Sequence, residues 1–249
     1  MSRFFLEVAY RGTAYSGFQS QQNANTIQAE LEKAFLILQK HRVEMTGSSR
    51  TDAGVHALQN FLHFDYDGLI EPHFVYKINA ILPGDIVIKS LNPVSDTAHC
   101  RFDAVSREYR YYLYQSKDPF LADRAFYFPY KLNMSKMQEA SELIKEFTDF
   151  TSFSKRNTQV KTFKCQILES QWGFVDNRMV YNVKANRFLR GMVRALTATM
   201  LRLGRGKISI DDFRQIIEAR DCTKASFAVP PHGLFLEKVE FPSALYSGL

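Results

Sequence analysis

Cysteine is scarce in this chain, which has three cysteines among its 249 residues. Cys100, Cys165 and Cys222 lie far apart, form no CxxC pair and leave an odd one after any pairing. Disulfide frameworks use even sets of cysteines, and zinc sites use closely spaced pairs. The sequence therefore predicts neither kind of site, and a cytoplasmic protein in a reducing compartment is expected.

Long apolar runs are absent as well. No run of about 18 uncharged apolar residues occurs, and Arg3 and Glu7 interrupt the apolar N-terminal segment. A transmembrane helix needs such a run, and an export signal needs an unbroken apolar core. We therefore expect neither a membrane span nor a signal peptide.

The usual motifs of cofactor and metal chemistry are also missing. The chain has no GxxxxGK[ST], GxGxxG or GxSxG segment, which argues against nucleotide hydrolysis, dinucleotide redox chemistry and serine hydrolase chemistry. Its six histidines show neither HxxxH nor HxxEH spacing. We expect no metal, no nucleotide cofactor and a reaction that needs no cofactor.

Acidic residues are missing from residues 177–210, although the chain has 26 of them against 32 Lys and Arg, a net charge of +6. The pattern predicts a helix over 187–203, on which Arg187, Arg190 and Arg194 share one face. A row of guanidinium groups suits phosphates, whereas a charged helix face is more often simply solvated. The missing acids favour phosphate binding. The bases of this segment are Arg178, Lys184, Arg187, Arg190, Arg194, Arg202, Arg205 and Lys207.

A second segment without acids covers residues 150–168. Its mixture of bases and aromatic residues suits contact with a nucleic-acid backbone and stacking on bases, and an ordinary exposed loop fits it equally well. The residues concerned are Phe153, Lys155, Arg156, Lys161, Phe163 and Lys164.

The first part of the chain is expected to follow the order β-α-β-β-α-β, which is typical of a ferredoxin-like domain with helices on one face of an antiparallel sheet. A capping box of Asn25 and Gln28 is expected to start the first helix, which should end near Lys40. The expected elements are strand 3–10, this helix, strand 42–46, strand 57–66, helix 71–81 and strand 85–91.

The second part repeats this order, with Ser135 and Gln138 expected to cap its first helix. Its expected elements are strand 105–115, helix 135–147, strands 163–172 and 178–185, helix 187–203, an extra helix near 211–220 and strand 234–240. The fold class is therefore α+β, with two domains, 1–104 and 105–249. Two such sheets can join edge to edge, which leaves a broad face for a large ligand, and ligand sites favour domain junctions.

A loop of small residues surrounds a charged pair in the run GSSRTDAGVHA, residues 47–57. Taken alone, Asp52 is best interpreted as a turn residue that bonds its own backbone. As a nucleophile it would need to be ionised and held in place, which a guanidinium achieves, and Arg194 is the candidate partner. Arg50 is freer to reach a substrate, and a loop-stabilising role for it stays open.

The strand over residues 107–114 places Tyr109 and Tyr111 on one side and Arg110, Tyr112 and Tyr114 on the other. A tyrosine that faces a cleft can stack on a base and offer its phenol for proton transfer. Filling the core is the alternative role for each of these side chains.

Together these residues resemble the bacterial tRNA pseudouridine synthase A family. The likeness starts with residues 10–19 and centres on 47–57. Its other matches are residues 26–28, 31–34, 79, 82–86, 99–102, 109–111, 149–153, 188–194 and 233–236. A series in this order is specific to the family, whereas any single match is weak.

The resemblance implies conversion of uridine to pseudouridine at positions 38, 39 and 40 of the tRNA anticodon arm, by a homodimer that flips the target base and uses no cofactor. Asp52 matches the essential catalytic aspartate, and Arg50 the arginine that enters the RNA stack in place of the uridine. Tyr109 matches the tyrosine that packs on the target base, and Leu234 the apolar residue on the base's other side. The family fold is two ferredoxin-like halves with a continuous, mainly antiparallel sheet and a basic cleft between the halves.

The sequence departs from the family at Arg11, where Asp is frequent, at Phe18, where Trp is frequent, and at Ser48-Ser49, where Ala-Gly is frequent. These positions bear on RNA contacts. Two other interpretations stay open. A noncatalytic RNA-binding module of the RRM type lacks its aromatic signature here, and a hydrolase of the N-glycosidic bond lacks a second carboxylate beside Asp52.

Overall fold

The computed structural model describes residues 1–156 and 160–245 and divides the chain into two compact units. Unit 1 comprises Met1–Val105 together with the segment that starts at Phe235, and unit 2 comprises Ser106–Leu234. The first boundary lies within one residue of the expected one. The expected division 1–104 and 105–249 differs at the C-terminus, because the chain returns to unit 1 for its last strand.

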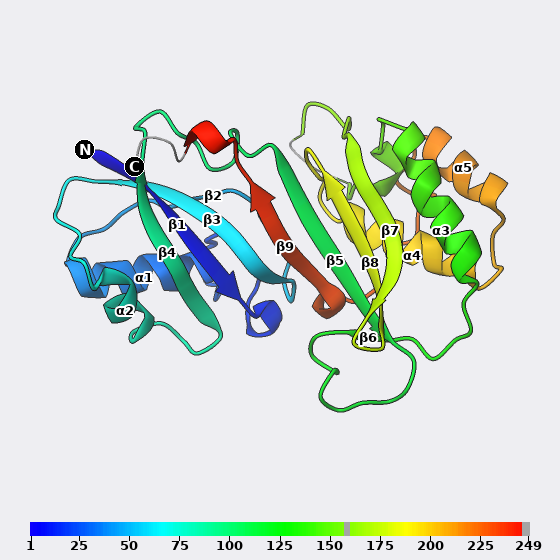
Figure 1. Cartoon of the computed structure of the whole chain (residues 1–249), viewed down its shortest axis with the longest axis horizontal. Coiled ribbons are helices and arrows are strands. Elements are labelled where there is room, and N and C mark those ends of the chain that lie inside the picture. Colours follow the sequence, from blue (N-terminus) through cyan, green and yellow to red (C-terminus); the bar gives the residue numbers. More distant parts are fainter. Residues whose placement is uncertain (157–159, 246–249) are drawn as a thin grey trace. The chain divides into compact units, whose positions relative to one another are not determined.

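Unit 1 contains a sheet in the order β4-β1-β3-β9 (Figure 1). Strands β1 (Ser2–Tyr10), β3 (His56–Tyr66) and β4 (Ile86–Val94) pair antiparallel, whereas β9 (Leu234–Glu240) pairs parallel with the start of β3. Strand β2 (Thr46–Gly47) pairs with β3 and is only two residues long, so the expected strand 42–46 was wrong. The architecture is mixed α/β with mostly antiparallel pairing.

Two helices, α1 (Ile27–Gln39) and α2 (Phe74–Asn79), cover one face of this sheet. Phe35 of α1 is fully buried and its ring lies 5.0 Å from that of Phe64 and 5.7 Å from that of Phe74. These aromatic contacts join both helices to β3.

Short 3-10 turns also occur among the described residues, at Gly12–Ala14, Ile144–Glu146, Thr151–Phe153, Pro231–Gly233 and Ser243–Leu245.

Unit 2 contains a sheet in the order β5-β8-β7, formed by the antiparallel strands β5 (Ser106–Tyr114), β8 (Arg178–Ala185) and β7 (Ile167–Val175). The short β6 (Phe126–Tyr127) pairs parallel with β5. Helix α3 (Met134–Leu143) packs on β7, α4 (Met192–Gly204) and α5 (Ile210–Glu218). Trp172 stacks on Tyr181, and its indole N–H points to the sulfur of Met200 at 3.3 Å, which fixes α4 on the sheet.

Three helix starts differ from the expectations. Thr26 rather than Asn25 caps α1, because its backbone is extended and its hydroxyl accepts a hydrogen bond from the Ala29 N–H. Asn133 caps α3 in place of Ser135 in the same way. Helix α4 starts at Met192, because Gly191 takes a left-handed conformation with φ of 75°.

The late start of α4 corrects one functional expectation. Arg187 and Arg190 precede the helix, so the prediction that they share a helical face with Arg194 was wrong. No helix within residues 1–156 and 160–245 is long and apolar enough to cross a membrane.

Candidate active site

The loop that carries Asp52 lies in unit 1 between β2 and β3. Asp52 is partly exposed, and its main-chain carbonyl accepts a hydrogen bond of 3.2 Å from the Val55 N–H, which closes a tight turn. Arg50 is exposed in the same loop. Asp52 therefore lies in a turn that its main chain closes, and its side chain is partly exposed.

Buried polar groups hold this loop from behind. The Tyr10 hydroxyl lies 2.9 Å from the Thr51 hydroxyl, and the side-chain amide of Asn60 donates to the Ser49 carbonyl at 2.9 Å and to Tyr10 at 3.3 Å. The Phe18 N–H donates to the Thr51 carbonyl at 3.1 Å. Each of these bonds forms away from water, where leaving one unmade is costly. They restrict the motion of the residues on either side of Arg50 and Asp52.

The segment after β1 approaches the loop so closely that one position excludes every side chain. A Cβ atom at Gly12 would lie 2.0 Å from the Val55 carbonyl oxygen. The Gly12 N–H donates to Nδ1 of His56 at 3.2 Å, which fixes the start of β3. Residues 10–19, where the resemblance to the family starts, therefore support the Asp52 loop.

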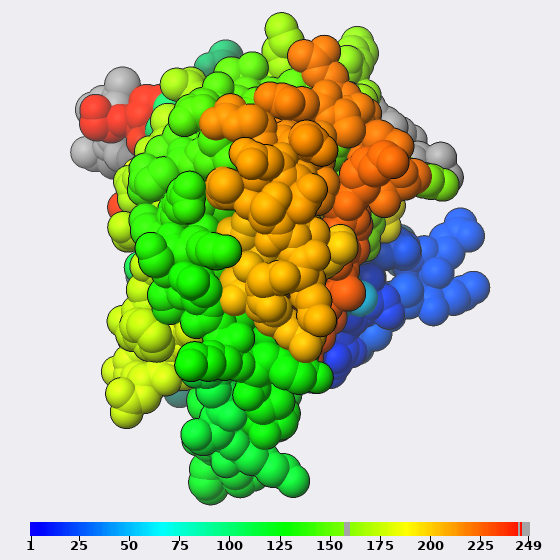
Figure 2. All heavy atoms as spheres, turned by 90° about the vertical axis from the view of Figure 1, so that its right-hand side faces the viewer, coloured from blue at the N-terminus to red at the C-terminus, as the bar shows by residue number. Residues whose placement is uncertain are grey.

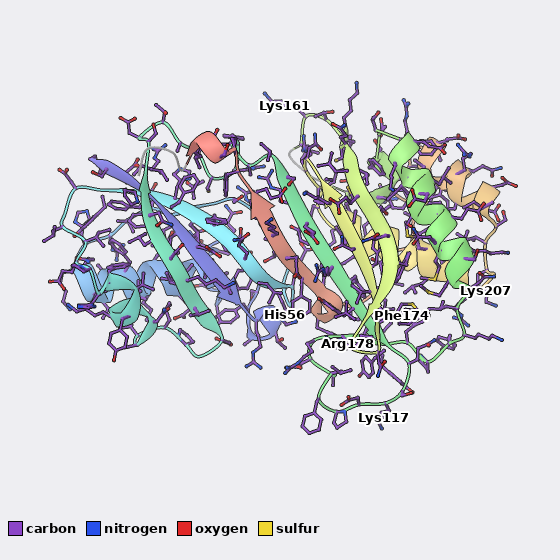
Figure 3. All side chains as sticks on the ribbon, in the orientation of Figure 1. His56, Lys117, Lys161, Phe174, Arg178 and Lys207 are labelled. Carbon is purple, nitrogen blue, oxygen red and sulfur yellow. The ribbon has the colours of Figure 1, made fainter. Side chains whose placement is uncertain are left out.

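Strand β9 places the start of the C-terminal segment beside the end of this loop. His56 pairs with Phe235, and the two rings stack with their centroids 4.5 Å apart (His56 is labelled in Figure 3). Leu234 directly precedes Phe235 and is buried. The apolar residue that the sequence singled out thus begins the strand that pairs with β3.

In unit 2, two neighbouring tyrosines of β5 have different surroundings. Tyr111 is fully buried and donates from its hydroxyl to the Pro230 carbonyl at 2.7 Å, and burial raises its pKa. Tyr109 is 8% exposed and meets Phe188 edge to face at 5.0 Å. Core filling, the alternative considered for these tyrosines, therefore describes Tyr111.

Arg194 lies in the first turn of α4 and binds main chain within unit 2. Its Nε and Nη2 atoms both donate to the Val229 carbonyl oxygen, at 3.1 and 2.7 Å. This oxygen belongs to the segment that leads into β9, so Arg194 helps to fix the approach to Leu234. Asp52 and Arg194 belong to different units, and their pairing stays a prediction.

The two acid-free segments of the sequence meet in unit 2. The Lys155 N–H donates to the Arg190 carbonyl at 2.9 Å, and a Cβ at Gly191 would touch the Lys155 side chain at 3.1 Å. Arg187 lies near Cys165, where its charge opposes the burial that raises the pKa of that thiol to about 11. Residues 157–159 of the first segment lie outside the described residues. The chain thus gathers bases from two distant stretches, which suits a polyanion.

Asn60 is a supporting residue that sequence reasoning missed. It is fully buried on β3, and its side-chain NH₂ group donates to the Ser49 carbonyl of the loop. The signal was a polar residue at a position where the strand pattern calls for an apolar one. Among residues 1–156 and 160–245, no group of three or more His, Cys, Asp or Glu side chains is arranged to hold a metal ion.

Comparison with known proteins identifies the family of this chain. A family described as tRNA pseudouridine synthase matches residues 7–103 and 147–242. The tRNA pseudouridine synthase A of Porphyromonas gingivalis is 44% identical over 99% of this chain and 100% of its own length, and that of Parabacteroides distasonis is 42% identical over 99% and 98%. The protein of the same name from Staphylococcus saprophyticus is 38% identical over 95% and 90%. On the strength of a profile match to most of the chain and of full-length relatives, this chain belongs to the tRNA pseudouridine synthase family.

Proposed function

We propose that this chain isomerises uridine to pseudouridine at positions 38, 39 and 40 of the tRNA anticodon stem-loop, with Asp52 as the catalytic carboxylate. The observation that carries the proposal is the loop of Asp52, which is held by buried hydrogen bonds and ends beside β9. A carboxylate fixed in this way can act on a bound nucleoside without first paying the entropy of ordering.

The reaction is an isomerisation and needs no co-reactant. The bond between N1 of the uracil and C1′ of the ribose breaks, the base turns, and C5 bonds to C1′. The proton leaves C5 and N1 gains one, so atoms and electrons balance. Asp52 serves as nucleophile or as base in this sequence of steps, and the same variant tests both roles.

Other residues have supporting roles in the proposal. Tyr109 packs on one side of the target base and Leu234 on the other, while Arg50 fills the gap that the flipped nucleotide leaves in the stack. This contact offsets part of the unstacking cost of a few kcal/mol. Arg187 and Arg190 bind phosphates.

Arg194 keeps Asp52 ionised in this scheme, and a homodimer binds the anticodon arm. The finer prediction of the fold belongs to the same proposal: two ferredoxin-like halves, a continuous sheet and a basic cleft between the halves. Crosslinking of the target nucleotide to the protein tests the cleft. Mass spectrometry identifies the attached residues, which should come from both halves. Sedimentation that detects only monomer would exclude the dimer.

The deciding experiment incubates unmodified tRNA transcripts with the wild-type protein and with Asp52→Asn, and maps pseudouridine at each position. We expect product at positions 38–40 with the wild type and none with the variant. Absence of pseudouridine with bound RNA supports the noncatalytic module, and release of free uracil supports the hydrolase. Full activity of the Asp52→Asn protein would show that another residue is essential.

A further inference from the structure

One end of unit 2 carries exposed aromatic rings and basic side chains that have no role in the proposed active site. Phe174, near the end of β7 in the β7–β8 hairpin, is 64% exposed, and Arg178 at the start of β8 lies over the Tyr112 ring at 4.9 Å. At the end of α4, Arg205 lies over the Tyr130 ring at 3.9 Å. Tyr130 is itself 48% exposed. Two guanidinium groups are thus placed within cation–π distance of tyrosine rings.

Further lysines extend this end of the unit. Lys117 follows β5 and Lys207 follows α4, and both are exposed. Figure 3 shows Lys117, Phe174 and Arg178 toward the lower end of unit 2, with Lys207 on the same unit. In Figure 2 the green segment that follows β5 projects at the bottom of the view, near the yellow-green hairpin. We call Lys117, Tyr130, Phe174, Arg178, Arg205 and Lys207 the hairpin-end surface.

The charge of this surface is unbalanced. Asp176 pairs with Arg178 at 3.0 Å, but Lys117, Arg205 and Lys207 form no ion pair with any residue that the structure describes. A two-fold contact between copies of the chain would set this positive surface against itself, which like-charge repulsion disfavours. Exposed aromatic rings interleaved with bases instead fit RNA, whose bases stack while its phosphates meet the cations.

The surface is separate from the bases near Arg187. Arg178 begins β8 and Arg187 follows its end, and a strand of eight residues spans roughly 25 Å. A single phosphate cannot reach both groups. An RNA that contacts both ends of β8 therefore does so with two different segments of its own chain.

We propose that the hairpin-end surface is a second RNA-docking site, which binds a part of the tRNA outside the anticodon arm. The inference rests on the proposed function, because it takes the tRNA as the substrate. It adds a contact that selects whole tRNA over an isolated stem-loop of the same sequence.

The test compares Lys117→Gln/Lys207→Gln with the matched control Lys77→Gln/Lys145→Gln. The control removes the same charge from exposed lysines that pair with Glu71 and Glu142. Binding of a whole tRNA transcript and of its anticodon stem-loop is measured from low to moderate salt. We expect whole tRNA to bind the test variant roughly tenfold more weakly, with a salt slope smaller by about 1.5 to 2. Stem-loop affinity should change less than twofold.

Phe174→Ala should weaken binding of whole tRNA about fivefold or more without a change in the salt slope, because it removes a stacking surface and no charge. Affinity of the test variant equal to that of the control overturns the inference, as does an equal loss with stem-loop and whole tRNA. Loss of self-association with RNA affinity kept would assign the surface to contacts between copies and would also overturn it. Pseudouridine formation by the wild type is measured in a separate assay. A failure of the proposed function is therefore distinguished from a failure of the docking surface.

Discussion

Gly12 and Val55 lie so close that a single methyl group at residue 12 would overlap the Val55 carbonyl oxygen, at 2.0 Å. The two residues join the segment after β1 to the end of the Asp52 loop. Because the obstacle is main chain, no rotamer change relieves it. Gly12→Ala should therefore displace the loop, reduce turnover at least 100-fold and destabilise the protein by about 2–4 kcal/mol, in the range of overpacked sites.

Single-turnover assays and urea unfolding measure both effects of Gly12→Ala. Gly84→Ala is the matched control, because a Cβ there meets nothing within 4 Å. Equal behaviour of the two variants would show that the close approach at Gly12 does not hold the loop.

Tyr10→Phe removes the hydroxyl that contacts Thr51 and Asn60 beneath the Asp52 loop. Two buried polar groups lose a partner, so we expect a loss of about 1–3 kcal/mol in the free energy of unfolding. Turnover should fall while KM for tRNA stays within about twofold, because the hydroxyl supports the loop from its buried side. A change confined to KM would contradict this role.

Arg194→Lys keeps the positive charge but loses the fork that donates twice to the Val229 carbonyl. If orientation of the segment before β9 matters, Arg194→Lys should recover only a small part of the turnover that Arg194→Ala loses, with RNA binding partly kept in both. The comparison uses single-turnover rates and tRNA affinities. If Arg194→Lys turned over tRNA at the wild-type rate, the positive charge of Arg194 would be sufficient and its two hydrogen bonds to Val229 would not be needed.

His63 makes unfolding depend on pH. It is 7% exposed, packs 4.6 Å from the His99 ring and 3.2 Å from the Cys100 sulfur, and faces Arg3, Asp65 and Asp103. Burial lowers its pKa to about 4, so the unfolded state binds a proton more readily between pH 6.5 and 4. Stability is thus complete above pH 6.5 and falls as the pH drops through this window, by up to about 3 kcal/mol.

Urea unfolding at pH 7 and pH 5 measures the effect of His63, and His63→Gln should flatten the dependence. The control is His73→Gln, because His73 is exposed on the same unit. A pH dependence that survives in His63→Gln would assign it to another group.

Most strand positions could be predicted from the sequence because alternation reports burial directly, although β7 starts at Ile167, four residues later than expected. Strands β1, β3, β5 and β9 lie within a residue or two of their expected bounds. Helix starts were harder to predict, because a cap depends on the backbone conformation of one residue. Gly191 has a positive φ and precedes the first residue of α4, so Arg187 and Arg190 lie outside the helix. Local spacing cannot show such a break.

The candidate site was predictable in its residue types but not in its support. The motif identified Asp52 and Arg50. The two contacts of the Tyr10 hydroxyl, with Thr51 and Asn60, and the close approach of Gly12 to Val55 join residues more than 40 positions apart. A pattern read along the chain has no access to contacts of that range. The membership of β9 in unit 1 escaped prediction for the same reason, because parallel pairing with β3 leaves no local trace.

The late return of β9 also affects the order of events on the ribosome. The strand that lies beside the Asp52 loop starts about 130 residues after unit 1 has otherwise been synthesised. At 5–20 residues per second, the nascent chain waits on the order of 7–26 s before that strand exists. During this interval the edge of β3 next to His56 is open to mispairing. The Asp52 loop acquires its neighbouring strand only after residue 240 has been synthesised.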